Sequence, residues 1–169
     1  LKVRSSIHYG EDLTFNCEFV NLANQTVHYQ SVCYFYRLHC NSAMHAKRTE
    51  PIRKKIYFSH LEILKVFIDI LERLKSRDNC IINNVKLFET KVLQQKQNVI
   101  YTLMQCSDTK FVKKQLKNLT SINLYPYKMP KYVTKITKTR AKRLINLMLR
   151  KKFTALLFHR IWKILGKNK

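Results

Sequence analysis

The stretch IRKKIYFSHLEILKVFIDILERLK, residues 52–75, carries the strongest structural signal in the chain. Apolar residues recur there at spacings of three and four, which is typical of one face of an amphipathic α-helix. Charged side chains largely occupy the other faces, and Pro51 is well placed to open the helix. The pattern therefore predicts a helix over residues 52–75. Its predicted apolar stripe is Tyr57, Leu61, Leu64, Ile68, Leu71 and Leu74.

Similar patterns predict further helices on both sides of this stretch. A short helix is expected over residues 11–24, with two acids in its first turn. After a loop at 76–84, a second amphipathic helix is expected over about 85–106, and Ser107-Asp108 then offers a cap for a short helix that ends near Leu119. The apolar residues that fit the first of these helices are Leu13, Phe15, Phe19, Val20 and Leu22. The second helix places Val85, Phe88, Val92, Val99 and Leu103 on one stripe, and the third is expected to turn Phe111, Val112, Leu116 and Leu119 inward.

Two segments allow more than one interpretation. Residues 26–38, TVHYQSVCYFYRL, are rich in β-branched and aromatic types, so a short β-hairpin near residues 26–40 and a helix reaching Ala46 are both open. After the linker at 120–131, no helix breaker occurs before Gly166. Residues 131–165 are therefore predicted as one long helix, or as two with a bend near Arg150-Lys151-Lys152.

The expected fold is mainly α: a small helical bundle body followed by a long basic amphipathic C-terminal helix. Two glycines and three prolines leave little for the tight turns of a β-barrel or sandwich. The apolar face expected to pack on the body consists of Leu144, Ile145, Met148, Leu149, Phe153, Leu156, Leu157, Ile161 and Leu165.

Charge is distributed very unevenly along the 169 residues, whose formal net charge is +23. Residues 1–108 hold 15 Lys or Arg and all 10 acids, whereas residues 109–169 hold 18 Lys or Arg and no acid. We therefore divide the chain into a helical body with an N-terminal arm, 1–108, and a basic helical extension, 109–169. A solvated helix face normally mixes the two signs of charge, so an acid-free extension indicates counter-charges on another molecule.

This extension supplies the candidate nucleic-acid-binding residues. Cations three or four residues apart stack on one helix face and can follow a phosphate backbone. Tyr125 and Tyr127, in the loop YPYKMPKY, could stack on unpaired RNA bases or instead fill space between helices. The candidate cations are Lys113, Lys114, Lys128, Lys131, Lys135, Lys138, Arg140, Lys142, Arg143, Arg150, Lys151 and Lys152, and KRTEPIRKK at 47–55 is a second, smaller patch.

Catalytic and cofactor-binding signals are lacking. The acids lie at helical spacings near lysines, which is typical of solvated ion pairs, and Gly10 and Gly166 alone cannot build a glycine-rich phosphate loop. Cys33, His39, Cys40 and His45 lack the spacing of a zinc site, because neighbouring ligands point apart and no Cys-x2-Cys pair is present. We expect no enzyme activity, small-molecule substrate, metal or cofactor, and no transmembrane helix, since no run of about 18 apolar residues exists.

Three hypotheses of function follow from these features. The first is a structural protein of a ribonucleoprotein, a mitochondrial or other organellar ribosomal protein that contacts rRNA and neighbouring ribosomal proteins. The second is a secreted, disulfide-bonded four-helix-bundle cytokine-like ligand of a cell-surface receptor, with glycans at Asn24 and Asn118. The third is membrane-surface activity of the tail, residues 151–169.

The sequence is compatible with an organellar or a secreted protein. The chain begins at Leu1, for which we expect a removed transit peptide or secretory signal. Cys17, Cys33, Cys40, Cys80 and Cys106 would form at most two disulfides in a secreted protein, and would be small buried apolar residues in a reducing compartment.

Overall fold

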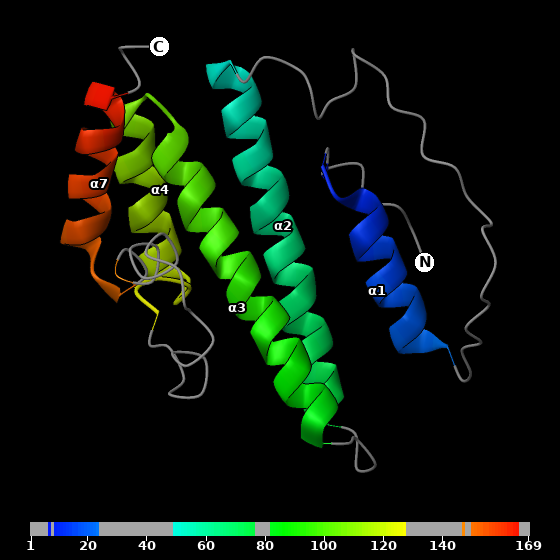
Figure 1. Ribbon diagram of the computed structural model, residues 1–169. Helices are drawn as coiled ribbons and strands as arrows, with labels where there is room; N and C mark the ends of the chain where they lie inside the picture. The colour runs from blue at the N-terminus through cyan, green and yellow to red at the C-terminus, as the bar shows by residue number, and fades with distance from the viewer. Residues whose placement is uncertain are drawn as a thin grey trace.

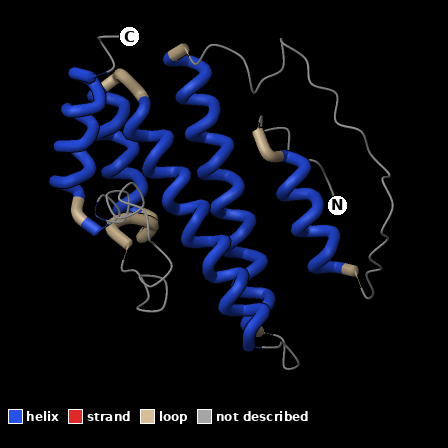
Figure 2. Tube along the Cα trace, in the orientation of Figure 1, coloured by secondary structure: helices blue, strands red, loops and turns tan. Residues whose placement is uncertain are grey.

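The computed structural model describes residue 7 and residues 9–23, 49–76, 82–127, 147 and 150–165. In these residues the chain is mainly α-helical and contains no strand (Figure 2). The predicted mainly α fold is confirmed, while the alternatives for residues 26–46 lie outside the described residues. The helices are α1 (Glu11–Leu22), α2 (Glu50–Lys75), α3 (Ile82–Gln105), α4 (Thr109–Ser121) and α7 (Lys152–Leu165).

The body of the molecule is a helical bundle built on a long antiparallel hairpin of α2 and α3 (Figure 1). Helix α1 packs beside α2, whereas α4 and α7 pack against the part of α3 near its C-terminus (Figure 1). The start of α2, the end of α3, the start of α4 and the end of α7 lie at the same end of the bundle (Figure 1). This end therefore gathers four helix termini.

Helix α1 begins after a glycine whose backbone conformation is restricted to few residue types. Gly10 has φ +80°, in the left-handed region, and Thr14 N–H donates to its carbonyl oxygen at 3.3 Å. A Cβ atom at this position would lie 3.1 Å from Ile63 Cδ1 of α2. Glycine thus meets both a backbone and a space requirement where α1 approaches α2.

The predicted helices over residues 11–24, 52–75 and 85–106 are confirmed, with small differences at their ends. Helix α2 begins at Glu50, with Pro51 in its first turn as expected. Helix α3 begins at Ile82, so three residues predicted as loop are helical.

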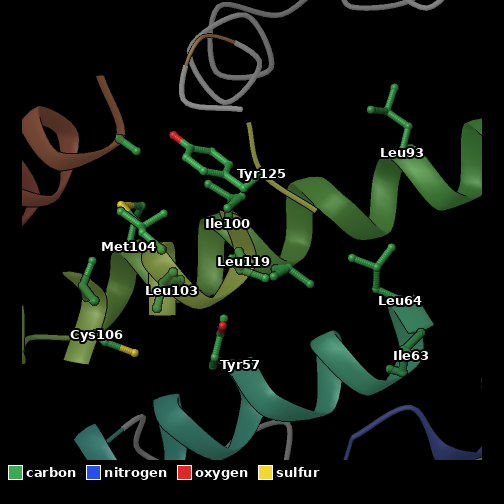
Figure 3. Packing of buried hydrophobic residues seen from close by; sticks show 14 of the residues in the cluster. Tyr57, Ile63, Leu64, Leu93, Ile100, Leu103, Met104, Cys106, Leu119 and Tyr125 are labelled. Carbon is green, nitrogen blue, oxygen red and sulfur yellow. The ribbon is translucent and has the colours of Figure 1, made fainter. Parts of the chain in front are cut away.

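The core extends over more of α2 and α3 than the predicted stripes. Tyr57 and Leu64 are buried as expected, but Ile63, Val66 and Ile70 are buried as well, because α2 lies between α1 and α3. Figure 3 shows Tyr57 entering the cluster from α2 and Tyr125 from the opposite side of α3. On α3, Val92, Val99 and Leu103 confirm the prediction, while Leu93, Ile100 and Met104 extend the buried surface.

Helix α7 begins at the position where the sequence predicts a bend. Lys151 is not helical, so a single uninterrupted helix over residues 131–165 is wrong, and the alternative with a break at 150–152 fits this position. The Thr154 hydroxyl, in the first turn of α7, donates to Lys151 O at 2.7 Å and to Leu147 O at 2.9 Å. Most of residues 128–149 lie outside the described residues, including the predicted basic helix before the break.

Candidate nucleic-acid interface

Helix α4 carries a face composed of four exposed lysines, Lys110, Lys113, Lys114 and Lys117, here called the lysine face. The opposite side of α4 packs in the core through Val112, Leu116 and Leu119, as predicted. The first and last of these lysines are seven positions apart in the sequence, which corresponds to about 10 Å along the helix axis. The lysine face therefore presents a compact row of positive charge to solvent.

Acids do not neutralise this row within the described part of the chain. The ion pairs found there involve Lys54, Lys65, Arg73 and Lys75, and none involves a lysine of α4. Residues 109–169 contain no Asp or Glu at all. Four like charges within two helical turns oppose one another, so an external anion would stabilise this face.

A network around Asp108 fixes the start of α4. The Asp108 carboxylate accepts from Phe111 N–H at 3.0 Å, which confirms the predicted N-cap. Lys54 Nζ of α2 donates to the same carboxylate at 2.9 Å. The pKa of Asp108 lies below its ordinary value because of the Phe111 hydrogen bond first and the Lys54 hydrogen bond second. This network orients α4 by its contact with α2.

Glu50 and Arg53 complete the connection between α2 and the α3–α4 corner. The Glu50 carboxylate accepts from the backbone N–H groups of Ser107, at 2.7 Å, and Asp108, at 3.2 Å. Arg53 donates to the carbonyl oxygen of Gln105 at 2.9 Å, in the last turn of α3. These contacts satisfy backbone groups that a helix end leaves without partners.

Two residues of the second cationic patch expected at 47–55 do not present free charge to a ligand. Arg53 and Lys54 are part-buried and are bound to Gln105 and Asp108. Lys54 also lies over the Phe111 ring, 4.7 Å from its centroid. Their charges are thus used inside the fold, while Lys55 is exposed.

Tyr125 and Tyr127 both belong to the packed body. Tyr125 is only 2% exposed, so neither face of its ring is open to a stacking base, and burial raises its pKa. Tyr127 is half-buried, and Lys96 Nζ lies 3.8 Å from its ring centroid. Burial lowers the pKa of Lys96. In this arrangement both rings fill space between helices, so neither is used in the interface described here.

Helix α7 packs through a face that only partly matches the expected one, in which Leu156 is half-buried against the core as predicted. Ala155 and His159 are buried, whereas Leu157 and Ile161, expected to pack on the body, are 48% and 45% exposed. His159 Nδ1 donates to Met104 O at 3.3 Å, and its Nε2 lies 3.3 Å from Thr109 Oγ1. The small alanine and these two contacts hold α7 close to α3 and to the start of α4, which leaves Leu157 and Ile161 outside.

The structure places the candidate cations in three groups. Lys113 and Lys114 lie on the lysine face, and Arg150 and Lys151 are exposed just before α7. Lys152 is the first residue of α7, with its side chain outside the description. The remaining candidates fall outside the described residues: Lys128, Lys131, Lys135, Lys138, Arg140, Lys142 and Arg143.

The candidate set omitted Lys110 and Lys117, which complete the lysine face. The spacing 110, 113, 114 and 117 carried this signal, because residues three, four and seven apart share one side of a helix. Lys163 of α7 was outside the candidate set as well, and its Nζ reaches Thr109 Oγ1 at 3.5 Å.

Neither a cluster of metal ligands nor a membrane-spanning helix is found in the described residues. No three potential metal ligands come together there, and Cys33, His39, Cys40 and His45 are outside these ranges. None of the helices in the described residues has the length and apolar character needed to cross a membrane. Cys17 and Cys106 carry free thiols, and burial raises the pKa of Cys106 to about 12.

Comparison of the chain with protein-family models, curated proteins and solved structures finds no match. The interface is therefore characterised by its own chemistry: exposed lysines in a row and an acid-free extension.

Proposed function

We propose that this protein is a non-enzymatic, RNA-binding structural component of a ribonucleoprotein, in which the basic extension contacts the RNA backbone. The lysine face of α4 is the observation that carries the proposal, since its four exposed lysines share one side of the helix. The acid-free composition of residues 109–169 extends the same charge along the rest of the chain. A polyanion is the partner that such a surface requires.

RNA fits this surface better than a sequence-specific site on DNA. Lysine contacts to phosphates give affinity and orientation but do not read bases. The sequence contains no RNP motif, GXXG loop or zinc-finger spacing. Selectivity would then come from the shape of a folded RNA, whose phosphates lie at fixed positions relative to the lysine row.

Within this class, the proposal is an organellar, most specifically mitochondrial, ribosomal protein that contacts rRNA and neighbouring ribosomal proteins. A ribosomal protein needs a modest folded body and a basic extension, and it needs no active site. The helices α1 to α3 and the basic extension that begins with α4 would supply these two parts. The cations between Lys128 and Arg143 lie outside the described residues, and they are included in this proposal because of their sequence alone.

Fractionation of cells that express the untagged full chain tests this function. We expect the protein to sediment with ribosomal particles, and to leave them after ribonuclease treatment or in high salt. Replacing Lys135, Lys138, Lys142 and Arg143 by glutamine should abolish the association and leave helix content intact. Accumulation of the protein in the medium, with glycans on Asn24 or Asn118, would overturn the proposal and support the secreted alternative.

A further inference from the structure

Helix α7 presents an exposed apolar stripe that no described part of the chain covers. Leu157, Ile161 and Ile164 are 48%, 45% and 67% exposed. Their spacing of four and three residues places them within about 60° of one another around the helix. The stripe lies opposite His159 and Ala155, which hold α7 against α3.

We propose that this stripe is the docking site for an α-helix of a partner protein, one that carries apolar residues flanked by carboxylates. Anchors at positions i, i+4 and i+7 are the pattern by which two amphipathic helices recognise each other. The three residues follow one line along the helix, which matches a helical seam.

The charge around the stripe specifies an acidic partner. Arg160 is exposed on α7 beside the stripe, Lys163 is exposed further round the helix toward Thr109, and Arg150 and Lys151 are exposed just before the helix. No acid is present in residues 109–169 to pair with them. Carboxylates on the flanks of a partner helix would complement these cations while its apolar residues cover the stripe.

Other occupants match these features less well. A second copy of this chain would bring its own Arg160 and Lys163 toward the same cations, and like charges repel. A phosphate backbone has no apolar surface for Leu157 and Ile161.

The apolar stripe is separate from the lysine face, because Leu157, Ile161 and Ile164 lie on α7 whereas the lysine face lies on α4. Arg150 and Lys151 are candidates for both interactions, so the test of docking changes only the apolar residues. The two can therefore fail separately. In a ribonucleoprotein, the extension would contact RNA through α4 while α7 contacts a protein neighbour.

The test uses the full chain and a fluorescein-labelled synthetic helical peptide with leucines at the same spacing and glutamates on both flanks. A second peptide, in which serine replaces the leucines, measures attraction due to charge alone. We expect fluorescence anisotropy to show at least tenfold tighter binding of the leucine peptide. Equal binding of the two peptides would overturn the proposal.

Variants of the chain then locate the binding. The triple variant Leu157→Gln, Ile161→Gln, Ile164→Gln should lose the preference for the leucine peptide and keep wild-type RNA binding. The matched control is Leu22→Gln, Leu87→Gln, Ile122→Gln, whose positions are 57%, 65% and 51% exposed on other parts of the body. This control variant should still prefer the leucine peptide. If it lost that preference as fully as the α7 triple variant does, the proposal would be overturned. Circular dichroism checks that the α7 triple variant folds, and Ile164→Gln alone replaces it if it does not.

Two further measurements test the other possible occupants of the stripe. Flotation with phosphatidylcholine–phosphatidylserine vesicles and sedimentation velocity are run on the same proteins. Stripe-dependent vesicle binding or dimerisation, without a preference for the leucine peptide, would overturn the proposal.

Discussion

Lys54 Nζ lies 2.9 Å from Asp108 Oδ2 and joins the second turn of α2 to the N-cap of α4, 54 residues later in the chain. The same carboxylate accepts from Phe111 N–H at the start of α4. Because α4 carries the lysine face, this pair positions the proposed interface relative to the body. The charges of Arg53 and Lys54 thus serve the fold, while those of α4 are left for a ligand.

Replacing Asp108 should destabilise the protein in proportion to the contacts removed. Asp108→Ala removes both the N-cap and the ion pair, whereas Asp108→Asn keeps a good N-cap and loses only the charge. We expect the urea midpoint to fall for both variants, and to fall further for alanine. Asp69→Ala, which removes an exposed i,i+4 ion pair with Arg73, is the control and should change the midpoint least. Equal midpoints for the two Asp108 variants would contradict the role of the cap.

Tyr57 is predicted to contribute to stability mainly through its ring. Its hydroxyl donates to Gln115 Oε1 at 3.3 Å in the core, and Asn118 Nδ2 donates to the same oxygen at 3.4 Å. Tyr57→Phe should therefore cost about 1 kcal/mol of unfolding free energy, because Gln115 keeps one partner. Tyr57→Ala should cost about 3–5 kcal/mol, since it opens a cavity between α2 and α4. Urea denaturation measures both, and similar losses for the two variants would contradict this division.

His60 should make stability fall as the pH is lowered through the histidine range. Burial lowers its pKa from 6.5, and Gln95 Nε2 donates to its Nδ1 at 3.0 Å. Below about pH 6.5 the unfolded chain binds a proton at this residue while the folded chain does not, so the unfolded state is favoured. The loss begins near pH 6.5 and ends at the lowered pKa of the folded state.

Urea denaturation at pH 7.5 and pH 5.5 checks this pH dependence. The wild type should lose more stability between the two pH values than His60→Gln, which cannot titrate there. Parallel losses in the two proteins would show that other groups cause the effect.

Gly10 is predicted to tolerate other residues poorly. Its φ of +80° is unfavourable for residues with a Cβ, and that atom would lie 3.1 Å from Ile63 Cδ1. Gly10→Ala should cost about 1–2 kcal/mol in unfolding free energy. Gly10→Asn should cost less, because asparagine accepts left-handed backbone more readily and caps helices well. Thermal unfolding of the two variants checks this order, and a stabilising alanine would contradict it.

Sequence periodicity predicts much of the fold and less of the interface. The helices and the Asp108 cap follow from local patterns that a short window contains, as at residues 52–75 and at Ser107-Asp108. The burial of Ile63 depends on its position beside Gly10, where α1 approaches α2, and this contact lies outside any such window.

Long-range contacts explain the remaining differences. Periodicity cannot show that Lys54 pairs with Asp108, or that Tyr125 enters the core against α3. On α7, small size at Ala155 and hydrogen bonds at His159 decide which face packs, and apolar periodicity alone favours the larger side chains. The lysine face is different, because its spacing is fully local and was readable in residues 110–117.

The salt dependence of binding to a structured rRNA fragment tests the role of the lysine face most directly. Each lysine that contacts a phosphate contributes about 0.7–0.9 to the slope of log K against log salt. Changing Lys110, Lys113, Lys114 and Lys117 to glutamine should therefore weaken binding at low salt and reduce the slope by about 3. A matched variant with Lys65, Lys75, Lys86 and Lys91 changed to glutamine, all exposed on α2 and α3, should keep the wild-type slope. Equal slopes for the two variants would contradict the assignment of the lysine face to RNA.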